Sequence, residues 1–210
     1  EGALLAAADE FNITLTGQGG HAAAPHEAID TNLAAAHVLI ALQSIASRNT
    51  DPLKQVVVSV CTLRSDTDSH NVLPHQVLLR GTVRTLDPEV QDLAERRLHD
   101  LTRLTAEAHQ CRAEIDYQRG YPVTRNHNDH TRYAAEAADK VTPGTDRDTP
   151  PIMAGEDFSY MLNARPGAYI MIGNGEGATV HHPEYDFDDA AIPAGCSWFA
   201  QVVEDRLARA

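Results

Sequence analysis

Residues Gln76–Glu89 read QVLLRGTVRTLDPE, and they join a strand signal directly to a helix signal. The first part, Gln76–Leu86, is rich in β-branched and apolar residues and predicts a strand. Asp87 then offers a carboxylate to cap a helix, and Pro88 suits the first helical position because its missing N–H is not needed there. We therefore predict a long, charged amphipathic helix over residues 89–109.

The segments on either side extend this unit. Alternating or concentrated β-prone residues predict three more strands, EFNITLT (Glu10–Thr16), KQVVVSVCTL (Lys54–Leu63) and CRAEIDY (Cys111–Tyr117). Ile29–Ser47 is rich in Ala and Leu at helical spacing and predicts a helix capped by Asp30 or Thr31. The order β-α-β-β-α-β over residues 9–118 is ferredoxin-like. We expect two helices on one face of a four-stranded antiparallel sheet, with the other face free for a partner.

The remainder, residues 1–8 and 119–210, is predicted to be an incomplete α/β segment of a second domain, which makes the fold class α+β. Three elements are predicted there: a helix over residues 129–141, a short buried strand GAYIMIG over residues 167–173, and a closing helix over residues 194–208.

Composition excludes several classes of protein. The 210 residues include 17 Lys and Arg against 30 Asp and Glu, a net charge of −13. Nucleic-acid binding requires a basic surface that displaces counterions, so we expect no nucleic-acid partner. The sequence has no run of 18 apolar residues, so we expect no membrane span. The opening EGALLAAADEF has no basic segment before its short apolar stretch, so we do not expect it to be a secretory signal.

Cysteine usage indicates the compartment. Cys61, Cys111 and Cys196 form no CxxC pair and are odd in number, which fits neither a disulfide framework nor a zinc ribbon. We expect a reducing cytoplasm, with each cysteine buried as a small apolar residue.

Two loops and one strand carry candidate binding residues. His21 follows a glycine pair in GGHAAAPH, where an imidazole could stabilise an oxyanion or bind a carboxylate; a glycine turn with incidental histidines is the alternative. Asn71, in SHNVLPH, offers both a donor and an acceptor, although simple turn chemistry explains the same residues. Arg84 lies within a strand pattern, where it either binds a carboxylate or occupies an exposed strand face.

Two acidic stretches could belong to a site. In HHPEYDFDD, His181 and His182 precede four carboxylates, a composition that suits a divalent-metal site or a solvated acidic loop. Adjacent histidines rarely bind one ion together, so at most one of the pair is expected to be a ligand. Glu156 and Asp157, in AGEDF, either cap a helix or line an active site.

The chain as a whole resembles the aminoacylase and carboxypeptidase family of two-metal amidohydrolases, and within it the branch of hippurate hydrolase and the indole-acetyl-amino-acid hydrolases. Five motifs carry the resemblance in order: EFNITLTGQGGHAAAPHEAIDT, HNVLP, GTVRTLDPE, AGEDFSYML and HHPEYDFDD. The resemblance implies that residues 9–118 are a lid domain through which the protein forms a homodimer. It also implies hydrolysis of an N-acyl-amino acid, or release of a C-terminal amino acid, by metal-activated water.

The resemblance also implies roles for individual residues. His21 would be the lid histidine that reaches a neighbouring subunit's site and stabilises the tetrahedral intermediate. Asn71 and Arg84 would bind the substrate carboxylate, Glu156 would line the substrate site, and His181 would bind a divalent metal such as Zn, Mn, Ni or Co.

Several family motifs are absent from the sequence. The His-x-Asp and Gly-His-Asp metal motifs are missing, and so is the Glu-Glu pair that supplies the general base. We therefore expect an incomplete metal site and an inactive isolated chain. The alternatives are a non-catalytic dimerisation or binding module and a small-molecule-sensing domain.

Overall fold

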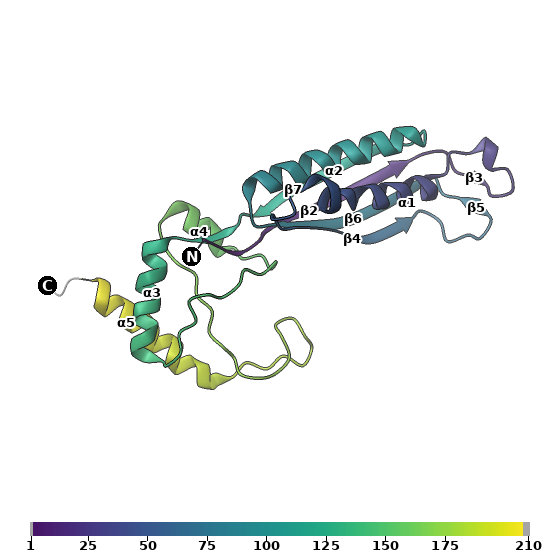
Figure 1. Ribbon diagram of the computed structural model, residues 1–210. Helices are drawn as coiled ribbons and strands as arrows, with labels where there is room; N and C mark the ends of the chain where they lie inside the picture. The colour runs from purple at the N-terminus through teal and green to yellow at the C-terminus, as the bar shows by residue number, and fades with distance from the viewer. Residues whose placement is uncertain (1, 208–210) are drawn as a thin grey trace. The chain divides into compact units, whose positions relative to one another are not determined.

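The computed structural model describes residues 2–207 and divides into two compact units (Figure 1). The larger unit contains residues 3–124 and 151–160, and the smaller contains residues 125–150, the chain from Met161 onward, and Gly2. The elements of the larger unit are β1 (Gly2–Leu5), β2 (Ala7–Thr16), β3 (Gly20–His21), η1 (Pro25–Glu27), α1 (Thr31–Leu42), η2 (Ile45–Asn49), β4 (Val56–Ser65), β5 (Val72–Leu73), β6 (Gln76–Thr85), α2 (Pro88–Ala108) and β7 (Arg112–Tyr121). They are followed by β8 (Thr124–Asn126), α3 (Asn128–Val141), α4 (Phe158–Ala164), η3 (Asp189–Ala191) and α5 (Ile192–Arg206).

A four-stranded antiparallel sheet forms the body of the larger unit, in the order β4-β6-β2-β7. Strands β2 and β6 pair over their whole length, from Ala7 opposite Thr85 to Thr16 opposite Gln76. Strand β4 lies at one edge of the sheet and carries a bulge between Val60 and Thr62. A second, two-stranded sheet joins β3 to β5 beyond the end of β2.

One apolar core holds this unit together. Every second residue of β2 is buried, including Phe11, Ile13 and Leu15. The same core contains Val38 of α1 and Leu98 of α2, so both helices cover one face of the sheet (Figure 1). Burial of each such side chain contributes about 1.5–3 kcal/mol to stability.

Close packing at the middle of the sheet requires glycine. A Cβ atom at Gly81 would lie 2.1 Å from the Ser59 carbonyl oxygen and 2.3 Å from the Phe11 ring. The Phe11 ring therefore occupies the space that any other residue at position 81 would fill.

The predicted helix caps are confirmed. Asp30 caps α1 by accepting a hydrogen bond from the Leu33 N–H at 3.1 Å. Asp87 caps α2 by accepting from the Glu89 N–H at 2.9 Å, and it also pairs with Lys54. The hydrogen bond from Lys54 holds the pKa of Asp87 below its ordinary value.

The smaller unit is organised around α3 and α5. The indole N–H of Trp198 on α5 donates to the Ala134 carbonyl on α3 at 2.9 Å, and Lys140 pairs with Asp205 at 2.6 Å. The ring of Tyr133 packs against the guanidinium of Arg206, 3.6 Å from the ring centre. These contacts place the two helices side by side.

Three sequence predictions are wrong in detail. Residues 167–173 form no strand, because the backbone N–H and carbonyl of Tyr169 bond to the side-chain amide of Asn126 instead of to a neighbouring strand. The helix predicted over residues 29–47 ends at Leu42, and a π-helical turn follows at Ile45–Asn49. The closing helix begins at Ile192, two residues earlier than predicted, and the last predicted residue lies outside the described residues.

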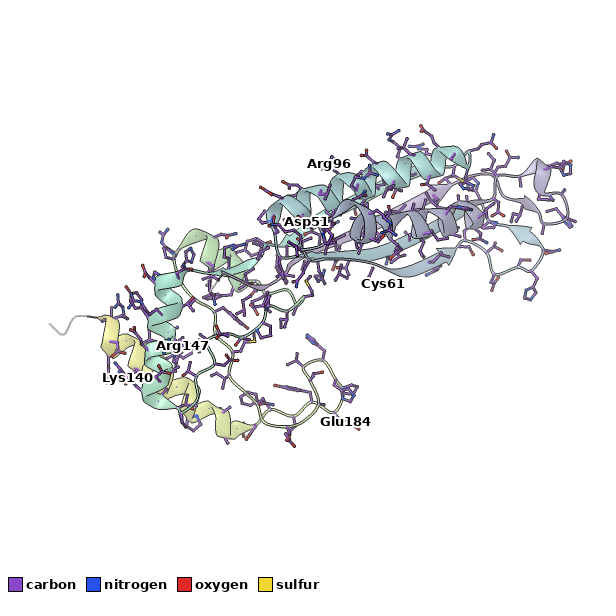
Figure 2. All side chains as sticks on the ribbon, in the orientation of Figure 1. Asp51, Cys61, Arg96, Lys140, Arg147 and Glu184 are labelled. Atoms are coloured by element: carbon purple, nitrogen blue, oxygen red, sulfur yellow. The ribbon has the colours of Figure 1, made fainter. Side chains whose placement is uncertain are left out.

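The prediction for the cysteines is wrong at two of three positions. Cys111 is buried, and burial raises the pKa of its thiol, but Cys61 and Cys196 are exposed. Cys61 lies at the bulge of the edge strand β4 (Figure 2). None of the described helices is both long and apolar enough to cross a membrane.

Candidate functional site

The loops beyond the ends of β2 and β6, residues 17–28 and 66–75, form what we call the tip of the larger unit. Backbone pairing joins the two loops, with Gly20 opposite Leu73 and His21 opposite Val72. The Thr31 hydroxyl, which is fully buried, donates to the Pro74 carbonyl at 2.8 Å and ties the tip to α1. These bonds give the tip a defined shape although it is a loop region.

His21 is exposed at the tip. Its Nδ1 accepts a hydrogen bond from the Ala23 N–H at 3.0 Å, and its carbonyl accepts from the Ala24 N–H at 2.8 Å. Gly19 allows the chain to approach the other loop, since a Cβ atom there would lie 2.9 Å from the Leu73 carbonyl oxygen. The glycine loop therefore positions the imidazole.

Asn71 lies beside His21. The Ala22 N–H donates to the Asn71 carbonyl at 3.0 Å, which joins the two predicted site residues through the backbone. The Asn71 side-chain Oδ1 accepts a hydrogen bond from the Ser69 hydroxyl at 3.0 Å. His21 and Asn71 are thus brought together at the tip.

Arg84 is half-buried near the opposite end of β6. Its Nη1 donates to the Asp9 carbonyl at 3.3 Å and to the Val83 carbonyl at 3.2 Å, and it also contacts the Thr82 hydroxyl. These bonds use one nitrogen of a guanidinium group that carries five N–H donors. The local backbone therefore anchors Arg84 at a fixed position.

The structure separates Arg84 from Asn71 and His21. Arg84 pairs with Ala8 at one end of β2, whereas Gln76, next to the tip, pairs with Thr16 at the other. Eight strand residues at about 3.4 Å each place these ends roughly 27 Å apart. An N-acyl-amino acid is about as long as a dipeptide, roughly 7 Å, so one such molecule does not reach both ends of the same chain.

Glu156 lies at the Arg84 end of the larger unit. Gly155 packs closely on Ala8, the residue opposite Arg84, because a Cβ atom at Gly155 would lie 2.8 Å from the Ala8 Cβ. Glu156 Oε1 accepts from the Phe158 N–H at 3.1 Å, and its carbonyl accepts from the Ser159 hydroxyl at 2.7 Å. One oxygen of the carboxylate therefore bonds the first residue of α4, as a helix-capping group does.

His181 and His182 lie in a loop of the smaller unit. Asn174 closes this loop by donating to the Asp186 carbonyl at 2.9 Å and accepting from the Asp188 N–H at 2.8 Å. An open pocket of about 360 Å³ lies in the loop and is lined by Asn174, Gly175, Glu176, Gly177, Ala178, Glu184, Asp186, Phe187, Asp188 and Asp189. Figure 2 shows Glu184 on this loop.

The two histidines differ in what their rings can bind. His182 Nδ1 accepts a hydrogen bond from the Glu184 N–H at 3.1 Å, so its neutral ring carries the proton on Nε2. A histidine binds a metal through the ring nitrogen that carries no proton, and in His182 that nitrogen already accepts the bond from the Glu184 N–H. Ligation by His182 would therefore require it to give up this hydrogen bond. His181, the residue before it, has a left-handed backbone conformation with a φ of +70°.

The described residues do not make a complete metal centre by themselves. Among residues 2–207, no three His, Cys, Asp or Glu side chains gather as metal ligands.

The comparisons with known proteins identify the family. The chain belongs to peptidase family M20/M25/M40, which matches residues 5–205. It is 30% identical to hippurate hydrolase of Campylobacter jejuni, a match that covers 96% of this chain and 53% of that protein. It is 32% identical to the IAA-amino acid hydrolase ILR1-like 5 of Arabidopsis thaliana, over 96% of this chain and 48% of the relative.

A solved structure extends the likeness to the whole fold. A dinuclear metal-binding peptidase of the M20 family from Bacillus subtilis matches with a TM-score of 0.80 at 26% identity, over 99% of this chain and 53% of that one. The chain therefore spans about half the length of the proteins it matches.

Sequence reasoning missed two features of the site. Strands β3 and β5 are two residues each, too short for any periodicity to reveal. Asp9, which lies beside Glu10 in the sequence, reads as a surface residue but is 1% exposed and supports Arg84 through its carbonyl. The sequence did hold a signal for Asp9. It lies two residues before Phe11 on the same face of the strand, so its carboxylate falls on the side that the apolar residues bury.

Proposed function

We propose that this chain is the lid and C-terminal part of a longer, metal-dependent amide hydrolase that cleaves N-acyl-amino acids or releases a C-terminal amino acid. Membership of peptidase family M20/M25/M40 and similarity to hippurate hydrolase and an IAA-amino acid hydrolase support this proposal. The antiparallel order β4-β6-β2-β7, with α1 and α2 on one face, supports a ferredoxin-like lid over residues 9–118. The unpaired cysteines support a reducing cytoplasm as its location.

The proposed roles of individual residues are those that the family resemblance implies. His21 is the catalytic residue of the lid and donates a hydrogen bond to the oxyanion that forms when the amide is attacked. Asn71 and Arg84 bind the carboxylate end of the substrate, and Glu156 lines the substrate site near Arg84. His181 contributes one ligand to a centre of divalent ions whose other ligands come from outside the described residues.

The observation that supports a site shared between two copies of the chain is the separation of His21 and Asn71 from Arg84 along β6. One small substrate does not reach both groups within a single chain. A composite site, in which the tip of one copy meets the Arg84 end of another, reconciles their proposed roles. We therefore propose that the protein works as a homodimer.

The edge of the sheet offers a surface for this dimer. Strand β4 pairs only with β6 in the described structure, so its outer edge can pair with a second copy. Helix α1, which packs near β4, exposes Leu33 and Ile40, with exposed fractions of 50% and 66%. Val57 and Leu63 of β4 are also exposed. Apolar residues on both elements are consistent with burial by an identical surface.

Sedimentation velocity tests the dimer. We expect the chain to sediment as a dimer, and Ile40→Asp to shift it to the monomer because a charge would enter an apolar interface. Leu53→Asp, at a loop position that is 92% exposed, is the matched control and should leave the dimer intact. A wild-type chain that stays monomeric at high micromolar concentration would contradict the proposed interface.

Hydrolysis tests the proposed activity. The isolated 210-residue chain should not cleave hippurate or N-acetyl-amino acids with added Zn²⁺ or Mn²⁺, because the described residues form no metal centre. Measurable metal-dependent turnover by this chain would overturn the claim of incompleteness. In the longer protein, His181→Ala should lower both the bound metal and the rate, and retention of both would remove His181 from the metal centre.

A further inference from the structure

Thr82 and Arg84 lie on the same face of β6, because alternate residues of a strand point to the same side of the sheet. This face is opposite the one on which Val83 is buried, and both residues are half-buried on it. Both side chains reach the carbonyl oxygen of Asp9 on the neighbouring strand β2. The Thr82 hydroxyl lies 2.7 Å from this oxygen, and Nη1 of Arg84 lies 3.3 Å from it. Thr82 and Arg84 also contact each other directly.

The direction of the hydrogen bonds at Thr82 is fixed by the chemistry of its two partners. A hydroxyl group can donate or accept, but a carbonyl oxygen only accepts and a guanidinium only donates. The Thr82 hydroxyl therefore donates its proton to the Asp9 carbonyl and accepts from Nη1 of Arg84 through a lone pair. Neither bond can run the other way, so Thr82 joins the guanidinium to the backbone of β2.

Among the described residues, every hydrogen bond of the Arg84 guanidinium uses the same nitrogen. Nη1 carries two N–H groups, and around it lie the carbonyl oxygens of Asp9 and Val83 and the Thr82 hydroxyl oxygen. These acceptors use both N–H groups of Nη1. The remaining donors are the Nε–H and the two N–H groups of Nη2. The Nε–H and one N–H of Nη2 point in parallel and form a fork that fits a planar, two-oxygen acceptor.

We propose that Thr82 is a positioning residue that holds Nη1 of Arg84 against the sheet and leaves the Nε–Nη2 edge to contact the substrate. The inference rests on the proposed function, in which Arg84 binds substrate, and it deepens that function by adding a residue and by choosing the edge of the guanidinium. Without the Thr82 hydroxyl, the guanidinium keeps only its backbone contacts and regains rotational freedom. The substrate would then have to order the side chain on binding, which lowers affinity.

The ¹⁵N-labelled 210-residue chain tests the positioning by NMR without any hydrolysis. The order parameter of the Arg84 Nε–H bond should be near that of a rigid group, about 0.85, in the wild type. It should fall below about 0.6 in Thr82→Val, which keeps the shape of the side chain but removes the hydroxyl. Thr82→Ser keeps the hydroxyl and should retain the order. An order parameter that Thr82→Val leaves unchanged would overturn the proposal.

Thr14→Val is the matched control. Thr14 is half-buried on β2 and pairs with Leu78, which lies on the same face of β6 as Thr82. The control therefore removes a threonine hydroxyl from the same face of the sheet without touching the contact to Arg84. It should leave the order of the Arg84 side chain unchanged.

Kinetics of the longer protein test the consequence for the substrate. Thr82→Val should raise the KM for hippurate about tenfold and leave kcat within about twofold, because it weakens binding of the ground state and the transition state alike. Thr82→Ser should restore the KM. In an Arg84→Ala background, Thr82→Val should have no further effect on the KM, because Thr82 acts only through Arg84.

The inference is overturned if Thr82→Val leaves the KM unchanged, or if it raises the KM equally in the wild-type and Arg84→Ala backgrounds. Failure of the proposed function gives a different result. Arg84→Ala would then leave the KM for hippurate unchanged, while Thr82→Val would still lower the order parameter of the Arg84 side chain.

Discussion

The phenol of Tyr117 donates a 2.7 Å hydrogen bond to Oδ2 of Asp9, a carboxylate that is only 1% exposed. The Gln91 amide donates to both carboxylate oxygens at 2.9 and 3.0 Å, and the Gly120 N–H donates to Oδ1 at 3.2 Å. These three hydrogen-bonding residues are all neutral donors, and their bonds offset the cost of burying the carboxylate. Because the Asp9 carbonyl also holds Arg84, this network supports a proposed substrate-binding residue.

Tyr117→Phe removes one donor to Asp9 and should lower the free energy of unfolding by about 1–3 kcal/mol, because the carboxylate stays buried with fewer partners. Urea denaturation measures the change. Tyr121→Phe is the control, since Tyr121 is 42% exposed and should change stability by less than about 0.5 kcal/mol. Equal effects of the two changes would show that the Asp9 contact contributes nothing specific.

High pH should weaken the same contact. Burial, reinforced by the hydrogen bond to Asp9, raises the pKa of Tyr117 above its ordinary value. Below about pH 10 the phenol is protonated in both folded and unfolded chains, so its contribution is fully present. Above that pH the unfolded chain loses the proton first, and folding stability falls. The stability difference between wild type and Tyr117→Phe should therefore shrink as the pH rises from about 10 to about 12. A constant difference across this range would refute the link.

Thr31→Val tests the bond that ties the tip to α1. The substitution removes the hydroxyl that donates to the Pro74 carbonyl and should cost about 1–2 kcal/mol of stability. Thr102→Val is the matched control, because Thr102 is also fully buried but its hydroxyl has no hydrogen-bond partner among the described residues. That change should be neutral or stabilising in thermal unfolding. A larger loss for Thr102→Val than for Thr31→Val would contradict the assigned contact.

Gly81→Ala should destabilise the larger unit by about 3 kcal/mol, because the new methyl group would collide with the Ser59 carbonyl and the Phe11 ring. Gly173→Ala has no atom within 4 Å of the added Cβ and serves as the control. Thermal unfolding of both variants gives the comparison. A melting temperature for Gly81→Ala equal to that of Gly173→Ala would be incompatible with the packing described.

The main elements of the larger unit were predictable because their signals are local. The alternating residues Glu10–Thr16 predict a strand, and the Asp87-Pro88 pair predicts the start of a helix. The structure has β2 and α2 at these positions. Residues 167–173 show the limit of this reasoning. Their β-prone composition does not supply a partner strand, and the side chain of Asn126, 43 residues from Tyr169, bonds the backbone instead.

The candidate site was predictable only in part, for a similar reason. The glycines around His21 and the proline after Asn71 mark loops that could carry function, yet they do not show that the two residues meet through β3 and β5. The distance between Asn71 and Arg84 follows from strand register, which is a long-range property. The contact between the side chains of Ser69 and Asn71 depends on their orientations, which the sequence pattern does not predict.

The placement of His21 and Arg84 at opposite ends of one sheet has a genetic consequence. In a two-fold dimer with composite sites, each copy would serve two sites, so one copy lacking both residues would disable the pair. A copy lacking only His21, combined with a copy lacking only Arg84, would instead gather both defects in one site and leave the other intact. Two alleles that are each inactive alone would then complement one another when expressed together.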